Sequence, residues 1–148
     1  MADPFVGRGQ GKTTVPPGRL TMGRSILVVD DSAVTRSAIK RIIGMVGLDD
    51  VEVLEADSGS AALKEMENHH VDLVLSDLNM PEMTGVEMVR RMRSSTEEKS
   101  TPVVVISTNP DAIQADELLA EGIAAYLHKP FTPEDIRDVL MNIWGDKL

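Results

Sequence analysis

Short apolar runs alternate with amphipathic segments five times along this chain, and this alternation restricts the possible fold more than any other feature. The apolar runs favour β-strands and lie at residues 26–29, 51–56, 71–75, 103–106 and 123–127. The segments after them have helical spacing of apolar residues and lie at residues 32–46, 58–68, 84–94, 111–121 and 132–144. Strict β-α alternation predicts an α/β fold, (βα)5, with a five-stranded, doubly wound parallel sheet covered by helices on both faces.

Capping residues mark several of the expected helix ends. Ser32 is a candidate N-cap, Gly47 a C-terminal stop, and Pro133 suits a first-turn position. In the first helix the stripe expected to face the core is Val34, Ala38, Ile39, Ile42 and Val46, and in the fourth it is Ile113, Leu118 and Leu119. Most of the methionines at helical spacing are expected to fill the core, namely Met45, Met66, Met83, Met88, Met92 and Met141. For Trp144 two positions remain open, over the core or partly exposed.

Length and charge narrow the function classes. With 148 residues, 42% of them hydrophobic, the chain is long enough for one domain with a substantial core. Residues 1–24 are rich in Gly and Pro and carry a net charge of about +3, so we expect a disordered leader or cloning remnant there and the folded domain at 25–148. The folded part then has a net charge of about −12, which disfavours binding to nucleic acid or anionic lipid. Without Cys or a membrane-length apolar run, a soluble cytoplasmic protein is expected.

Polar residues follow four of the expected strands. In an open doubly wound sheet, ligands bind beyond the carboxyl ends of the strands, where the winding direction reverses. Asp30 and Asp31 follow the first strand, Asp77 the third, Ser107 the fourth and Lys129 the fifth. Three carboxylates gathered there would repel one another unless a proton or a cation held them together. Oxygen ligands without Cys or clustered His favour Mg²⁺, with Asp31 and Asp77 as direct ligands.

Asp77 also has the surroundings of a nucleophile. A carboxylate presented beside a metal ion and a lysine can attack a phosphoryl group, and Mg²⁺ and Lys129 would neutralise the charge that develops on the phosphoryl oxygens. Each of these signals is weak alone, because an Asp after a strand is more often a turn or capping residue. Their joint placement favours a phosphoryl site.

Four motifs in order carry a resemblance to a known family. They are VVDDS (28–32), SDLNMPEMTG (76–85), VVVIST (103–108) and AYLHKPF (125–131). With them the chain resembles the response-regulator receiver domains, and more closely the stand-alone CheY-like members, over residues 25 to 145. The resemblance implies the flavodoxin-like strand order 2-1-3-4-5, which periodicity does not establish.

The resemblance also implies roles for individual residues. Asp77 would be the phospho-acceptor, Asp30 and Asp31 would position Mg²⁺ with the backbone carbonyl of Asn79, and Lys129 would contact the phosphoryl group. Ser107 would be the switch hydroxyl and Tyr126 the aromatic residue that turns inward, so that the face of helix 4, strand 5 and helix 5 changes. The Lys129-Pro130 bond would be cis.

Other features depart from the family or imitate a site. Thr108 stands where the family more usually has Ala or Gly, which predicts crowding at the phosphoryl entrance, and Asn79 and Asn109 occupy positions that tune acyl-phosphate hydrolysis. Residues 7–14 imitate a phosphate loop, but position 6 is Val rather than Gly and no strand precedes the segment. His69 and His70 lie in a connection without a third metal ligand nearby and are expected to be solvated. His128, beside Lys129, is kept as a candidate for a functional role.

The favoured function is a single-domain response regulator that takes a phosphoryl group on Asp77 from a histidine kinase or phosphotransfer protein. It is not expected to be an enzyme beyond its own phosphotransfer and dephosphorylation. We expect no output domain after residue 148, so the protein would act by contact, with CheY-like motor control as the first candidate, or as a phosphorelay intermediate. Two other classes remain, an aspartate-nucleophile phosphohydrolase, which would normally have a D-x-D motif, and a passive interaction module.

Overall fold

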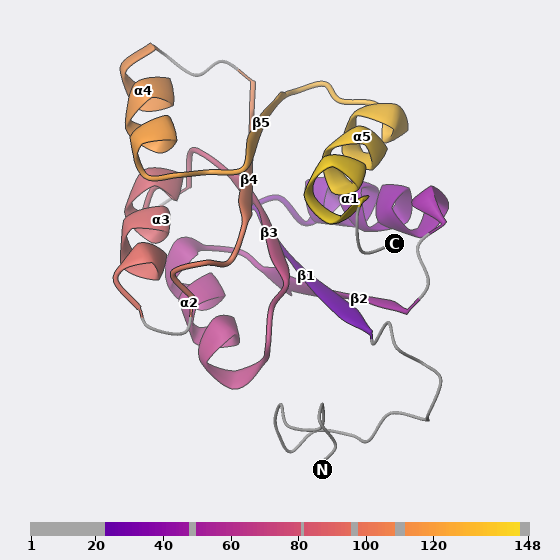
Figure 1. Ribbon diagram of the computed structural model, residues 1–148, viewed down its shortest axis with the longest axis horizontal. Coiled ribbons are helices and arrows are strands. Elements are labelled where there is room, and N and C mark those ends of the chain that lie inside the picture. Colours follow the sequence, from indigo (N-terminus) through magenta and orange to yellow (C-terminus); the bar gives the residue numbers. More distant parts are fainter. Residues whose placement is uncertain (1–22, 48–49, 81, 96–97, 109–111, 146–148) are drawn as a thin grey trace.

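Five parallel strands form a single sheet at the centre of the molecule. The computed structural model describes residues 23–145 apart from 48–49, 81, 96–97 and 109–111. The strands are β1 (Arg24–Val29), β2 (Val51–Ala56), β3 (Leu73–Asp77), β4 (Val103–Ser107) and β5 (Ala125–His128). Their order is β2-β1-β3-β4-β5, and all neighbouring pairs are parallel (Figure 1). The predicted fold class and the strand order implied by the resemblance are both confirmed.

Five helices cover the two faces of this sheet. They are α1 (Ala33–Val46), α2 (Gly59–Asn68), α3 (Gly85–Arg93), α4 (Ala112–Ala120) and α5 (Pro133–Trp144). Helices α1 and α5 lie against one face and α2, α3 and α4 against the other (Figure 1). The chain therefore changes face after β2, and the winding direction reverses between β1 and β3. A sheet of this kind opens its ligand crevice at that reversal, beyond the carboxyl ends of the strands.

The core has two layers because alternate residues of each central strand point to opposite faces. Leu27 and Val29 of β1 pack with α2, α3 and α4, whereas Ile26 and Val28 pack with α1 and α5. Burial on both faces explains why β1, β3 and β4 are nearly continuous apolar runs. Two polar residues near the ends of these strands, Ser76 and Ser107, are themselves buried.

The capping residues are placed as predicted. The Ser32 hydroxyl accepts a hydrogen bond from the Thr35 amide at 3.2 Å, and Gly47 ends α1 with a φ of 90°. Pro133 occupies the first turn of α5, behind a capping box formed by Thr132 and Asp135. The third strand lies two residues later than the predicted 71–75, and the Asp72 amide bonds to the Ser25 carbonyl just before it. Asp77 is consequently the last residue of β3.

Two predicted core positions are wrong. Val34 is 80% exposed and Leu119 is 66% exposed. Ile39 and Ile43 form the buried side of α1, and Val34 lies about 140° around the helix from Ile39 at 100° per residue. Leu119 lies about 100° from the fully buried Leu118, which places it on the outer side of α4.

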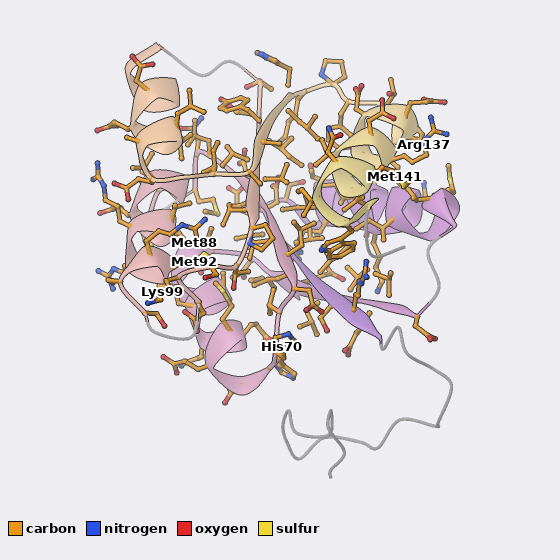
Figure 2. All side chains as sticks on the ribbon, viewed as in Figure 1. His70, Met88, Met92, Lys99, Arg137 and Met141 are labelled. Carbon is orange, nitrogen blue, oxygen red and sulfur yellow. The ribbon has the colours of Figure 1, made fainter. Side chains whose placement is uncertain are left out.

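The methionine prediction holds in part. Four of the six are buried, Met66, Met83, Met88 and Met92, whereas Met45 and Met141 are exposed. Figure 2 shows the contrast between Met88 and Met92 on α3 and Met141 on α5. Trp144 is buried, with the Arg24 guanidinium 4.7 Å from its ring centroid. This contact lies at the start of β1, the opposite end of the strand from Asp30. The predicted arm at residues 1–24 lies outside the described residues except for 23 and 24, and Asn109 lies wholly outside them.

Candidate functional site

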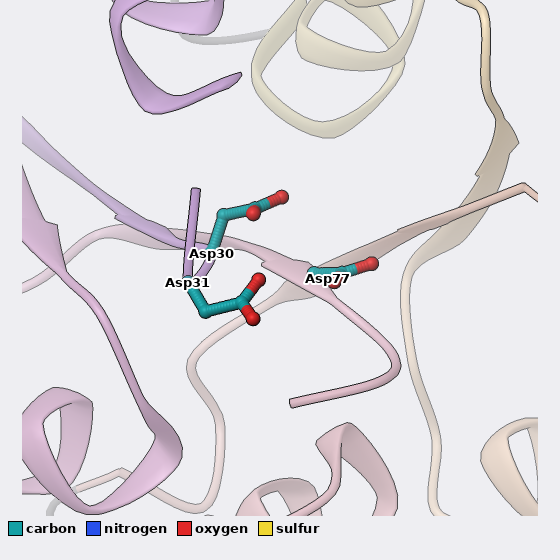
Figure 3. A group of neighbouring side chains, drawn as sticks. All are labelled: Asp30, Asp31 and Asp77. Atoms are coloured by element: carbon teal, nitrogen blue, oxygen red, sulfur yellow. The ribbon is translucent and has the colours of Figure 1, made fainter. Parts of the chain in front are cut away.

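Three acidic side chains gather where β1 and β3 end. Asp30 and Asp31 follow β1 and Asp77 ends β3, and one carboxylate oxygen from each lies within 4.8 Å of the others (Figure 3). Asp30 is buried, Asp77 is partly buried and Asp31 is exposed. The sequence predicts this convergence, because parallel strands deliver their carboxyl ends to one edge of the sheet. The group has one face in the protein and one toward solvent.

Asp30 is held by hydrogen bonds to both of its carboxylate oxygens. Oδ1 accepts from the Ser32 amide at 2.9 Å, and Oδ2 accepts from Lys129 Nζ at 3.3 Å. Such partners replace the water that a carboxylate loses on burial. The first bond belongs to the turn that starts α1, so the helix cap and the acidic site share one short segment of chain. The side chain of Asp30 therefore has little freedom.

Lys129 lies between two of the acids. Its Nζ is 3.3 Å from Asp30 Oδ2 and 3.5 Å from Asp77 Oδ1, and 22% of its side chain is exposed. Burial raises the pKa of the Asp77 carboxyl above its usual value of 3.8, and the charge of Asp30 acts in the same direction. Lys129 opposes this shift and lowers the pKa of Asp77. Asp77 is thus a carboxylate whose negative charge is costly without a further positive partner.

In metal-free protein, Asp77→Asn is expected to raise the free energy of unfolding at neutral pH. A carboxyl whose pKa is higher folded than unfolded binds its proton more tightly in the folded state, so the wild-type protein loses stability as pH rises from about 3.8 through the raised pKa. The advantage of the variant should therefore shrink as pH falls through that window. Urea unfolding with EDTA at stepped pH measures it. An advantage that stays constant down to acid pH would attribute the effect to packing rather than charge.

The connection after Asp77 is packed closely against the backbone of α3. The Gly85 amide donates to the Leu78 carbonyl at 2.8 Å, and the Ser76 hydroxyl donates to the Asp77 carbonyl at 2.8 Å. A Cβ on Gly85 would lie 3.0 Å from the Asp77 carbonyl oxygen and 3.1 Å from the Leu78 Cα. Both neighbours are backbone atoms that cannot move aside cheaply, so glycine is required here. This packing fixes the end of β3 and with it the position of Asp77.

Ser107 and Lys129 are joined through the backbone of neighbouring strands. Ser107 is buried at the end of β4, opposite His128, and its carbonyl accepts from the Lys129 amide at 2.9 Å. The Lys129-Pro130 peptide bond is cis, as the resemblance implies. Thr108, the next residue of the chain, is exposed beside this buried hydroxyl. The structure thus brings Ser107 and Lys129 to the same sheet edge as the acids.

Tyr126 lies deeper along β5. It is opposite Val105 in the ladder, packs against the core layer under α2, α3 and α4, and its hydroxyl oxygen is buried. Its ring is 5.7 Å from that of the exposed His128. The side chain therefore already points inward. Asn79 is exposed two residues beyond Asp77, in the connection to α3, and the role of its carbonyl remains a prediction.

The other two histidines lie away from this site. His69 contacts Glu65 at 3.2 Å and His70 contacts Asp72 at 2.9 Å, and both histidines are exposed. His70, labelled in Figure 2, precedes β3, whereas the acidic group is at the end of that strand. Within the described part of the chain, the acidic group is the only cluster of potential metal ligands, and no histidine belongs to it.

Arg36 also contacts this site, although the sequence patterns did not predict it. Its Nη1 donates to the Asp30 carbonyl at 2.7 Å, and its Nε pairs with Glu55 at 2.9 Å. Nothing in the sequence separates this arginine from the many that lie on solvated helix faces. Only the placement of the first turn of α1 over the end of β1 reveals the contact.

Comparisons with known proteins show which family and which fold this chain resembles. The chain is 35% identical to the chemotaxis protein CheY1 of Helicobacter pylori over 121 residues, which are 81% of this chain and 96% of that protein. The structure of the Vibrio cholerae chemotaxis protein CheY4 has a TM-score of 0.75 and 32% identity, and covers 82% of this chain and 99% of that chain. A third structure shares the fold at 24% identity, with a TM-score of 0.74 and coverage of 84% and 99%. It is the receiver domain of a Pseudomonas aeruginosa sensor histidine kinase with magnesium coordinated in the active site cleft.

Among the described residues, no helix has the length and apolar character needed to cross a membrane.

The family assignment follows from the match of the sequence itself. The profile of the response regulator receiver domain matches residues 26–141, which include all four motifs and every strand end discussed above. This chain therefore belongs to the response regulator receiver domain family.

Proposed function

We propose that this receiver domain is a phosphorylation switch in which Asp77 accepts a phosphoryl group from the phosphohistidine of a histidine kinase or phosphotransfer protein. The observation that carries the proposal is the shared position of Lys129, within 3.3 and 3.5 Å of Asp30 and Asp77, beside a third acid. A lysine and three converging carboxylates suit a site where negative charge is gained and lost. The chemotaxis relatives support an output that controls motility through contact with a target.

The acidic group fits a hard divalent cation. All of its donors are carboxylate oxygens and they lie within 4.8 Å of one another. Asp30, Asp31 and Asp77, with the backbone carbonyl of Asn79, would hold Mg²⁺. When bound, the ion supplies positive charge that offsets the negative charge on the oxygens of the transferred group.

The chain's own residues perform the transfer. An Asp77 carboxylate oxygen attacks phosphorus and forms an O–P bond, while the P–N bond of the donor breaks and its electron pair stays on the imidazole nitrogen. Lys129 Nζ is near enough to Asp77 to contact the incoming phosphoryl oxygens. Asp30 keeps that ammonium group aimed at the site from the other side. Hydrolysis of the acyl phosphate later returns the carboxylate.

The response to phosphorylation would run along β4 and β5. Phosphoryl oxygens on Asp77 would attract the Ser107 hydroxyl, and the inward position of Tyr126 would then be favoured. Both residues adjoin the α4-β5-α5 face, where a target would bind. We place the protein in the cytoplasm, with no nucleic acid or membrane as a direct partner. A phosphorelay role uses the same chemistry and differs only in the last step, in which a histidine of a second protein, rather than water, accepts the phosphoryl group and the O–P bond at Asp77 breaks.

The decisive experiment is intact mass spectrometry after incubation with acetyl phosphate, with and without Mg²⁺. A Mg²⁺-dependent gain of one phosphoryl group per chain supports the switch. Continued turnover of an added phosphoester would instead support a hydrolase, although Asn79 stands where a D-x-D motif would have its second acid. No adduct with any donor would leave a passive interaction module.

Thr108→Ala is expected to speed phosphorylation by small donors. Thr108 is exposed directly after the buried Ser107, at the same edge of the sheet as Asp77, and its branched side chain would narrow the approach of a donor. We expect roughly a two- to tenfold higher rate with acetyl phosphate, equivalent to at most about 1.4 kcal/mol of barrier. The rate is followed by phosphoprotein electrophoresis, with Thr101→Ala, two residues before β4, as a control. An equal or slower rate would contradict crowding as the role of Thr108.

A further inference from the structure

Arg36, a residue of α1, contacts both the acidic site and β2. Its Nη1 donates to the Asp30 carbonyl at 2.7 Å, the shortest contact at this edge of the sheet among those described here. Its Nε donates to Glu55 at 2.9 Å, near the end of β2, and 16% of its side chain is exposed. A planar guanidinium held at two of its nitrogens has a fixed orientation. Arg36 is thus a rigid link rather than a solvated side chain.

The carbonyl that Arg36 holds belongs to the peptide between Asp30 and Asp31. That peptide is planar, so fixing its oxygen also fixes its N–H and the direction in which the Asp31 Cα leaves. The preceding peptide is also anchored, because its N–H, the Asp30 amide, donates to the Ala56 carbonyl at 3.1 Å. The side chain of Asp31 is exposed, and it makes no hydrogen bond or ion pair with the described residues. Its aim depends on the backbone that Arg36 holds.

We infer that Arg36, oriented by Glu55, is a positioning residue that holds the Asp30-Asp31 peptide in the conformation that aims Asp31 at a bound divalent cation. This inference rests on the proposed function, because it assigns Asp31 to the cation. Groups that orient metal ligands from behind typically contribute about 10- to 100-fold to metal affinity. Arg36 has this place in the structure, because it contacts the backbone that carries two of the carboxylates and not the carboxylates themselves.

The sign of the effect separates positioning from simple charge. A positive side chain near a cation site repels the cation, so removing it should tighten Mg²⁺ binding if Coulomb interaction is all that matters. Loss of positioning should weaken binding instead. Lys40 provides the matched control, because its Nζ lies 3.7 Å from the same Glu55 and makes no described contact with Asp30.

The experiment is a Mg²⁺ titration of the full chain followed by amide chemical shifts in ¹H–¹⁵N NMR spectra. Arg36→Gln is expected to raise the Mg²⁺ Kd about tenfold or more, while Lys40→Gln leaves it unchanged or slightly lower. Arg36→Lys, which keeps the charge but not the two-point contact, should bind Mg²⁺ more weakly than wild type. Glu55→Gln should give a smaller loss in the same direction. The spectra also report whether each variant is folded.

The outcomes distinguish this inference from the proposed function. A normal wild-type titration with an unchanged or lower Kd in Arg36→Gln would overturn the positioning role alone. If Arg36→Gln does not fold, wild-type affinity in both Arg36→Lys and Glu55→Gln would overturn it equally. An equal weakening in Lys40→Gln would also overturn it, because that residue does not touch the Asp30 carbonyl. A wild-type protein that does not respond to Mg²⁺ would overturn both the inference and the proposed metal site.

Discussion

Asp77→Asn is expected to abolish formation of the acetyl phosphate adduct, from nearly one phosphoryl group per chain to an undetectable level. An amide nitrogen or oxygen cannot replace the carboxylate oxygen that forms the acyl phosphate bond. The change is otherwise nearly isosteric, so the surrounding packing at Leu78 and Gly85 should be kept. Intact mass before and after incubation with donor and Mg²⁺ measures the loss. No larger change in activity is expected from any single substitution in this chain.

The control for this prediction is Asp138→Asn, which makes the same chemical change at an exposed position of α5. It should be phosphorylated like wild type. Beryllofluoride provides a second readout, since a complex that mimics the acyl phosphate should form with wild type and Asp138→Asn but not with Asp77→Asn. A persistent adduct in Asp77→Asn would mean that another side chain, such as the Ser107 hydroxyl, is the nucleophile, and the proposed function would be wrong.

Asp31→Asn is expected to weaken Mg²⁺ binding by about 100-fold or more, because loss of a direct ligand should exceed the about 10- to 100-fold effect of an outer-shell group. Asp31 is the best of the three acids for this test, since it is exposed. Asp30 accepts hydrogen bonds from both Ser32 and Lys129, so its removal would disturb the turn as well as the charge. Stability of metal-free Asp31→Asn should be equal to wild type or slightly higher, because one of three neighbouring negative charges is gone.

Mg²⁺ affinity should be measured by calorimetry or NMR rather than by tryptophan fluorescence. The single tryptophan, Trp144, packs on Arg24 at the start of β1, whereas the acidic group lies beyond the other end of that strand. Its emission therefore has no direct reason to respond to the ion. Unchanged affinity in Asp31→Asn would remove Asp31 from the ligand set and leave a site formed by Asp30 and Asp77. The titration therefore decides between two ligand sets.

The regular parts of this structure were predictable because local chemistry determines them. Ser32 caps the start of α1 and Gly47 ends it, as their residue types favour. The apolar runs of β1 and β4 follow from burial on both faces. The convergence of Asp30, Asp31 and Asp77 follows from the parallel sheet once each acid is placed at a strand end. The strand order itself came from the family resemblance, because periodicity does not say which strands are neighbours.

The errors lie where tertiary placement decides. Val34 belongs to the apolar period of its helix, but the side that faces the sheet is set by Ile39 and Ile43. The contact of Arg36 with the Asp30 carbonyl depends on how the first turn of α1 lies over the end of β1, and no local pattern records that angle. Lys129 was predicted beside Asp77, whereas its second contact, with Asp30, was visible only in the fold.

The backbone bond from the Lys129 amide to the Ser107 carbonyl has a consequence for how the domain signals. It ties the ammonium-bearing residue and the hydroxyl-bearing residue into one unit, so displacing either chain segment strains the other. Intermediate arrangements, with one segment shifted and the other at rest, are thereby disfavoured. A target that contacts only β5 would therefore meet either the resting or the fully switched conformation of β4. Partial phosphorylation of a population would change the fraction of fully switched molecules.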